Sequence, residues 1–143
     1  MTISDSCCNN RSKDDPHNGL SGASRRAQHR SRGERLAAEY LLKEGFDLLH
    51  RNWRNGRCEI DLVARRDGVL HIIEVKSRAA DGLTAPEEAM TAAKFRSLCK
   101  AARSYIATYG LDMNVQFDFI GVEFDADGTH TLRYLPDAMA PRW

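Results

Sequence analysis

The sequence predicts a mixed α/β fold, with a sheet of about five strands flanked by helices. Three observations lead to this prediction. Apolar residues recur at helical spacing in two stretches, one beginning at Gly33 and a longer one beginning at Thr84. Segments of alternating apolar and polar residues lie between and after these stretches. The dipeptides Asn55-Gly56 and Asp67-Gly68 separate neighbouring segments, as expected of tight turns between strands.

With 143 residues, the chain has room for one folded domain, which we place at residues 32–138. Residues 1–31 are rich in Ser, Asn, Arg, Asp and Gly without apolar periodicity, which predicts a disordered basic tail. Residues 1–32 hold six basic and three acidic residues, whereas the net charge of the whole chain is only +1. The rest of the chain is therefore slightly acidic, unlike an avid, non-specific nucleic-acid binder. A polyanionic partner would need a local basic patch or a metal ion.

Hydropathy and cysteine spacing predict a cytoplasmic protein with no membrane partner. No stretch approaches the roughly 20 apolar residues that span a bilayer, and no apolar run typical of a secretory signal follows the first residues. The cysteines match neither a disulfide scaffold nor a zinc site. They are Cys7, Cys8, Cys58 and Cys99.

The first predicted helix begins at Gly33 and ends at Gly45, because glycine readily adopts the left-handed conformation of a helix C-terminus. An apolar stripe at helical spacing supports this helix. The stripe consists of Leu36, Ala37, Tyr40 and Leu41. A strand is expected at Phe46–Trp53, and two further strands lie within Glu59–Lys76.

The second predicted helix has a strong start signal, with Thr84 as the cap, Pro86 in the first turn and Glu87 three residues after the cap. It runs to about Tyr109 and ends at Gly110. Two strands and a terminating proline complete the prediction: Val115–Phe124, Thr129–Leu135 and Pro136.

The two central strands carry the candidate site. Strict alternation places Ile60, Leu62 and Ala64 on one face of the first strand and Glu59, Asp61 and Val63 on the other. The second strand is apolar on both faces, as expected of a strand covered on both sides. One of its faces nevertheless ends in Glu74 and Lys76. Burying such charges is costly unless a partner or a metal ion compensates them.

Asp61 and Glu74 can bring their carboxylates together if the two strands pair side by side. A hard divalent cation, Mg²⁺ or Mn²⁺, would remove their repulsion and activate water against a nucleic-acid phosphodiester. Lys76 would stabilise charge on the phosphate, and Glu34 would add a third acidic group if its helix crosses this edge. An ordinary cross-strand salt bridge explains the strand charges about equally well. The helix dipole alone explains Glu34.

Seven short motifs follow one another between Gly33 and Asp118. They are G-E-R-L-A-A-E-Y-L (Gly33–Leu41), G-F (Gly45–Phe46), N-W-R (Asn52–Arg54), E-I-D-L-V (Glu59–Val63), E-V-K-S-R (Glu74–Arg78), Lys94 and F-D (Phe117–Asp118). In this order they resemble the YraN family of bacterial proteins, whose function is uncharacterised. That family is similar to the restriction-endonuclease-like, PD-(D/E)xK superfamily and, in layout, to archaeal Holliday junction resolvases.

The resemblance implies a restriction-endonuclease-like fold and a metal-dependent DNA endonuclease, with branched or junction DNA as a candidate substrate. It implies four catalytic residues: Glu34, Asp61, Glu74 and Lys76. Asp61 and Glu74 would be metal ligands, with Glu34 as the third acid at the metal or the attacking water. A resolvase acts as a two-fold homodimer, so a homodimer is an expectation here. The alternative is a non-catalytic nucleic-acid-binding protein that retains the nuclease fold.

Two positions depart from the family pattern. Ile60 stands where the superfamily motif has Pro, and Cys58 stands where the YraN pattern usually has Gly. Two other polar residues are expected to be structural. His71 is predicted to be a hydrogen-bonded core histidine, and Asp118 to bond to a neighbouring loop.

Overall fold

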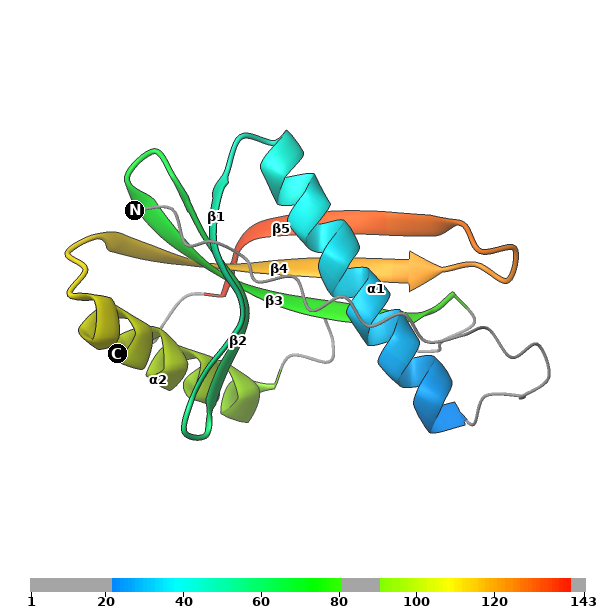
Figure 1. Ribbon diagram of the computed structural model, residues 1–143, viewed down its shortest axis with the longest axis horizontal. Coiled ribbons are helices and arrows are strands. Elements are labelled where there is room, and N and C mark those ends of the chain that lie inside the picture. Colours follow the sequence, from blue (N-terminus) through cyan, green and yellow to red (C-terminus); the bar gives the residue numbers. More distant parts are fainter. Residues whose placement is uncertain (1–21, 81–90, 140–143) are drawn as a thin grey trace, which may run out of the picture.

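The structure of the protein is a computed structural model that describes residues 22–80 and 91–139 (Figure 1). The first helix is followed by three strands: α1 (Gly22–Lys43), β1 (Asp47–Asn55), β2 (Cys58–Arg66) and β3 (Val69–Ala79). The second helix is followed by two strands: α2 (Ala92–Tyr109), β4 (Asn114–Phe124) and β5 (His130–Met139). The mixed α/β class and the order of elements are those predicted. Neither described helix has the length and apolar character of a membrane span.

The five strands form one mixed sheet in the order β1-β2-β3-β4-β5. Each neighbouring pair is antiparallel except β3 and β4, which run parallel. Parallel neighbours need a long crossover connection, and α2 lies in that connection. The helix α1 lies across one face of the sheet, and α2 packs against the other (Figure 1). The central strand β3 is therefore covered on both faces.

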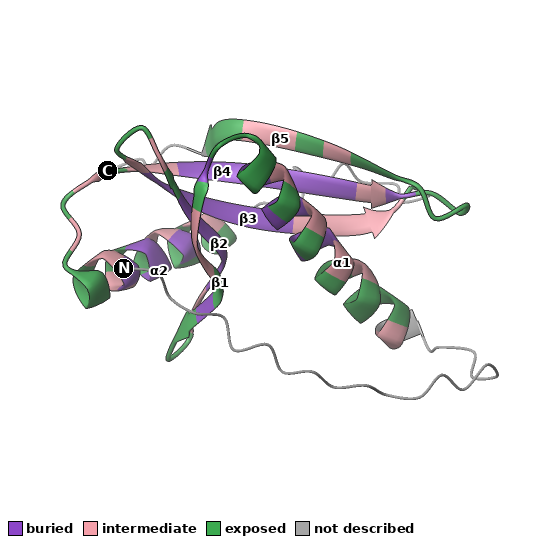
Figure 2. Cartoon of the chain, turned by 45° about the horizontal axis from the view of Figure 1, so that its top comes forward, coloured by how far each residue is buried: buried purple, intermediate pink, exposed green. Residues whose placement is uncertain are grey.

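The sheet separates two apolar cores, and β3 contributes to both. Ile73 and Val75 belong to the core beneath α1, whereas Leu70 and Ile72 belong to the core beneath α2. Figure 2 shows that β3 and β4 are buried along much of their length. The prediction of a strand that is apolar on both sides is thus confirmed. The helices contribute Ala37, Ala38 and Leu41 from α1 and Leu98, Ala101, Ala102 and Tyr105 from α2.

Several boundaries differ from those predicted. The helix α1 begins at Gly22, so that residues 22–31 are helical rather than part of a tail, while residues 1–21 lie outside the described residues. The predicted helix start at Thr84 also lies outside them, and α2 is described from Ala92, with the Thr91 side chain capping its first turn. The strand β5 continues through Pro136 to Met139. An edge strand tolerates proline because one side of it needs no ladder hydrogen bonds.

The predicted alternation along β2 is wrong at Ile60. Ile60 lies in the core beneath α2, whereas Leu62 lies in the core beneath α1. The change of face occurs at Asp61, where the neighbouring strand β1 contains Asn52 in a left-handed conformation with a φ of 51°. The regular pairing of β2 with β3 also ends here, at the Leu62–Ile73 pair. Asp61 is therefore the point at which β2 turns away from the centre of the sheet.

Gly33 sets the distance between α1 and β3. A Cβ atom added at Gly33 would lie 2.7 Å from the Ser77 Cβ and 3.0 Å from the Ser77 Oγ. The first distance is shorter than real Cβ atoms show, and the second is unusually tight. The absence of a side chain on Gly33 therefore allows the helix backbone to approach the strand closely.

Gly33→Ala is expected to lower the free energy of unfolding by about 1–3 kcal/mol, because the added methyl group forces α1 away from β3. In an uncrowded helix interior the same substitution would instead stabilise the protein by up to about 1 kcal/mol. Urea denaturation followed by circular dichroism measures the difference. The control is Ser31→Ala, at an exposed position of the same helix, which should change stability by less than about 0.5 kcal/mol. A Gly33→Ala protein as stable as the wild type would contradict the close packing.

Candidate active site

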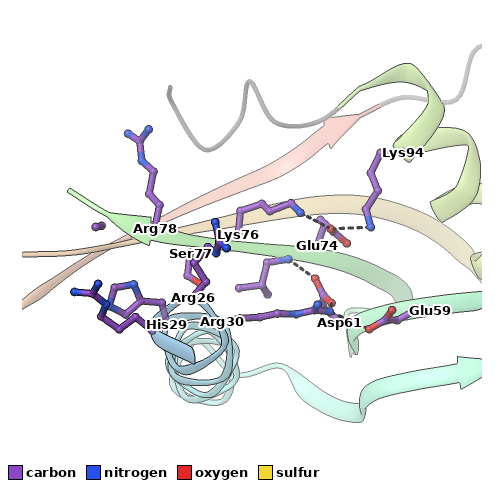
Figure 3. Close-up of a pocket in the computed structure, with 13 residues that line it drawn as sticks. Arg26, His29, Arg30, Glu59, Asp61, Glu74, Lys76, Ser77, Arg78 and Lys94 are labelled. Atoms are coloured by element: carbon purple, nitrogen blue, oxygen red, sulfur yellow. Dashed lines mark hydrogen bonds and ion pairs between the residues drawn. The ribbon is translucent and has the colours of Figure 1, made fainter. Parts of the chain in front are cut away.

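A cavity of about 740 Å³ opens beneath the first half of α1, beside the second half of β3 (Figure 3). The start of α2 and the point where β2 leaves β3 complete its walls. Six basic side chains line it, Arg25, Arg26, Arg30, Lys76, Arg78 and Lys94, together with His29. Three acidic side chains also line it, Glu59, Asp61 and Glu74. The cavity thus has a small acidic centre that is surrounded by basic side chains.

Asp61 and Glu74 form the acidic centre, and both are buried, with 6% and 3% of their surfaces exposed. Asp61 is held by the backbone of β3, since its Oδ2 accepts a hydrogen bond of 2.9 Å from the Val75 N–H. The side chain of Asp61 therefore bonds to β3 just where β2 stops pairing with it. The carboxyl group of Glu74 lies close enough to Asp61 to raise the pKa of Asp61. The structure thus brings together the two acids that the sequence predicted as metal ligands.

The proximity of Glu74 changes the acidity of Asp61. Burial and the negative charge of Glu74 raise the pKa of Asp61 to about 7. The hydrogen bond from Val75 and the positive charge of Arg30 oppose this rise without cancelling it. Near neutral pH the carboxyl group of Asp61 is therefore divided between its protonated and ionised forms.

Two lysines neutralise the charge of Glu74. Lys76 Nζ lies 3.7 Å and Lys94 Nζ lies 3.4 Å from the same atom, Glu74 Oε1 (Figure 3). Lys76 was predicted as a site residue. Lys94 was not, although it is one of the positions that carry the family resemblance. The two ammonium groups come from different elements and converge on one carboxylate.

Arg30 connects the remaining acidic residues. Its Nε donates to Glu34 Oε1 at 3.2 Å, and its Nη2 lies 3.0 Å from Glu59 Oε1 and 4.0 Å from Asp61 Oδ1. Glu34 is buried beside the cavity but does not line it, and it reaches Asp61 only through Arg30. Sequence analysis missed Arg30 because it lies in the stretch predicted to be a tail. The only signal was its position four residues before Glu34, on the same side of a continuous helix.

The donors that could hold a metal ion are the carboxylate oxygens of Asp61 and Glu74. In the described ranges 22–80 and 91–139, no three His, Cys, Asp or Glu side chains are gathered as a metal site. A pair of carboxylates is nevertheless a normal protein contribution for Mg²⁺, which retains several water ligands. The raised pKa of Asp61 reflects a repulsion that a divalent cation would relieve. The role of Glu34 as a third acid at the metal stays a prediction.

A second buried polar cluster lies beneath the other end of α1 and does not line the cavity. Asp118 Oδ2 lies 2.6 Å from His71 Nδ1 and accepts a 2.6 Å hydrogen bond from the Tyr134 hydroxyl. Its Oδ1 accepts hydrogen bonds from Gln116 and from the Asp137 backbone. Burial alone would raise the pKa of Asp118, but these four bonds together lower it. His71 is thus the hydrogen-bonded core histidine that was predicted, and Asp118 bonds to β5 rather than to a loop.

Asp61→Asn is expected to stabilise the metal-free protein at pH 8 by on the order of 2–4 kcal/mol. The pKa of Asp61 is raised from 3.8 to about 7 in the folded state, so stability is lost as pH rises through this interval and Asp61 ionises. Asparagine cannot ionise, and its side-chain oxygen can still accept the Val75 N–H. The two proteins should be nearly equal near pH 4.

Urea unfolding from pH 4 to pH 9 in a chelating buffer measures this effect. Glu59→Gln, which replaces a less buried acid of the same cavity, is the control and should not show the same pH-dependent gain. An Asp61→Asn variant that is less stable than the wild type at pH 8 would contradict the electrostatic description.

Comparison with known proteins identifies relatives of this chain. A family model described as "Uncharacterised protein family UPF0102" matches residues 33–122. A UPF0102 protein of Porphyromonas gingivalis is 40% identical over 106 residues, covering 72% of this chain and 78% of the relative. A UPF0102 protein of Bacteroides fragilis is 37% identical over 109 residues, covering 76% and 89%. One from Chlorobium chlorochromatii is 38% identical over 111 residues, covering 74% and 86%. The resemblance to the YraN family is thereby confirmed, and the chain belongs to the uncharacterised family UPF0102.

Proposed function

We propose that this protein is a metal-dependent endonuclease that hydrolyses phosphodiester bonds in DNA. One observation carries the proposal. Two buried acids, Asp61 and Glu74, lie close together at the wall of a cavity whose other charged side chains are mostly basic. Cations lie beside both acids, Lys76 and Lys94 at Glu74 and Arg30 at Asp61. Burial and the negative charge of Glu74 nevertheless raise the pKa of Asp61, so the cations do not fully compensate the acidic pair.

The residues fit a hard divalent cation such as Mg²⁺ or Mn²⁺. Asp61 and Glu74 would hold it, and they offer the oxygen donors that these ions prefer. When bound, such an ion polarises a phosphodiester and makes water a better nucleophile. Asp61 must be ionised to act as a ligand, so its pKa of about 7 favours activity at neutral to alkaline pH.

The cations of the cavity would bind the phosphodiester and balance its charge. Lys76 and Lys94 both lie at Glu74 Oε1, so a phosphate beside Glu74 would lie within reach of two ammonium groups. These groups can stabilise the extra negative charge that develops during hydrolysis. Arg30 holds Glu34 and contacts Asp61, which makes Glu34 a positioning residue in this scheme. The similarity of the family to the PD-(D/E)xK superfamily supports the same assignment of Asp61, Glu74 and Lys76.

Purified protein incubated with Mg²⁺ or Mn²⁺ is expected to cut at least one of three substrates: linear, nicked or four-way-junction DNA. Glu74→Gln and Lys76→Met should each reduce the rate by roughly 10²-fold or more, since each removes a charge that the transition state requires. Glu39→Gln, an exposed acid on α1 outside the cavity, should cut at the wild-type rate. Gel electrophoresis of end-labelled substrates provides the readout. Binding of all three substrates without cleavage would instead support the non-catalytic alternative.

Lys94→Met is expected to slow the same cleavage by about 10-fold, because one of the two ammonium groups at Glu74 is lost. Lys100→Met is the matched control, since it removes an exposed lysine of the same helix that does not line the cavity. The comparison uses single-turnover rates with enzyme in excess. Equal rates for the Lys94→Met and wild-type proteins would exclude a role for Lys94 in the reaction.

A further inference from the structure

The helix α1 consists of two halves with different environments. From Gly33 onward its inward side chains are buried in the core. Between Ser24 and Arg32, by contrast, no side chain is buried, and Figure 2 shows this half largely exposed. In Figure 1 the blue N-terminal end of α1 extends away from the strands. This half has no apolar stripe, and apart from the stacking of His29 on Phe124 and the contacts of Arg30 and Arg32 it gains little from packing. Its exposed surface is therefore suited to a binding partner.

Basic residues lie on two opposite sides of this exposed half. Arg25, Arg26 and Arg30 face the cavity of the candidate active site. A separate shallow hollow of about 440 Å³ lies on the outer side of the helix and contains no acidic side chain. It is lined by Gln28, Ser31, Arg32, Arg35 and Arg51. The outer side therefore carries three positive charges: Arg32 at the end of the exposed half, Arg35 in the next turn of the helix, and Arg51 from β1.

The charges of the outer hollow are not neutralised by carboxylates. The guanidinium of Arg32 donates a 2.9 Å hydrogen bond from Nη2 to the Gly128 carbonyl and lies 4.7 Å from the centre of the Phe124 ring. Both partners are uncharged, so they orient Arg32 without cancelling its charge. Within the described part of the chain, neither Arg35 nor Arg51 forms an ion pair with an acidic residue. This arrangement favours a polyanion.

The separation of the two basic sides indicates which polyanion fits. An α-helix with its side chains is about 10–12 Å across, and the major groove of B-form DNA is about 12 Å wide. A helix in this groove has a phosphate backbone on each side. The major groove of A-form RNA is too deep and narrow for such a helix, and a single strand would engage only one side.

We propose that the exposed half of α1 docks in the major groove of double-stranded DNA, with one strand in the cavity and the other along Arg32, Arg35 and Arg51. The statement that the strand in the cavity is the one that is cut rests on the proposed function. The docking itself does not depend on catalysis. It also provides the local basic patch that a protein with a net charge of only +1 needs in order to bind DNA.

The test is a binding measurement without catalysis, using the full chain in a chelating buffer. Fluorescence anisotropy compares a 20-base-pair DNA duplex with an RNA duplex and a single DNA strand of the same sequence. The test variant is the double substitution Arg35→Gln/Arg51→Gln. The matched control is Arg96→Gln/Lys100→Gln, which removes the same charge from exposed positions on α2, away from both cavities.

The wild type should bind the DNA duplex at least about 10-fold more tightly than the RNA duplex. For the DNA duplex, Arg35→Gln/Arg51→Gln should reduce the slope of log affinity against log salt by about 2, since two phosphate contacts are lost. Its affinity for the single strand should equal that of the wild type. The control should retain the wild-type slope. The proposal would be overturned if the two double variants lost the same amount of affinity for the DNA duplex. It would also be overturned if Arg35→Gln/Arg51→Gln lost as much affinity for the single strand as for the duplex, or if the wild type bound the RNA and DNA duplexes equally well.

The outcome separates this inference from the proposed function. If the duplex is bound as described but never cut with Mg²⁺ or Mn²⁺, the docking stands and the hydrolase proposal fails. If the duplex is cut and Arg35→Gln/Arg51→Gln binds and cuts it like the wild type, the docking fails and the hydrolase proposal stands.

Discussion

The electrostatic interaction between the neighbouring acids Asp61 and Glu74 is the one on which the rest of the site depends. Two acids in one buried position are unfavourable, and the surrounding structure compensates them from three directions. The backbone of β3 donates to Asp61 through Val75, two lysines approach Glu74, and Arg30 approaches from α1. The compensation is partial, because the pKa of Asp61 is still raised. An unfavourable electrostatic interaction that the surrounding residues do not fully compensate is characteristic of a functional site.

The position of Asp61 beside Glu74 follows from an irregularity in the sheet. In a regular ladder, β2 would continue beside β3, and its backbone would pair with that of Glu74 and Val75. Instead the regular pairs end at Leu62–Ile73, and the Asp61 side chain accepts a hydrogen bond from the Val75 N–H. The departure of β2 opens the space that becomes the cavity. The geometry of the candidate site and the interruption of the sheet are therefore one structural feature.

The fold could be predicted from the sequence to a large extent, because it is encoded locally. The turn at Asp67-Gly68 and the alternation of β3 identified the central hairpin. The parallel pairing of β3 with β4 was not predicted, because it joins segments far apart in the sequence. The face of Ile60 could not be predicted, because strict alternation assumes a strand without interruption. The extension of α1 to Gly22 was missed because its first half has no apolar stripe, which is the main signal of a helix.

The candidate site was predictable only in part, for a similar reason. Asp61, Glu74 and Lys76 lie on two strands of one hairpin, so pairing rules brought them together. Lys94 and Arg30 reach the site through tertiary packing of two helices against different faces of the sheet, and no local pattern specifies such contacts. Residues on paired strands are therefore easier to assign from sequence than residues on helices that pack over their ends.

The contact between Gly33 and Ser77 has a mechanical consequence. It lies where α1 leaves the core, so it is the last close contact with β3 before the exposed half of the helix begins. Arg25 lies eight residues away along the helix, a distance of roughly 12 Å. A small tilt at Gly33 is therefore magnified at the arginines, so the packing of Gly33 on Ser77 controls where these arginines lie.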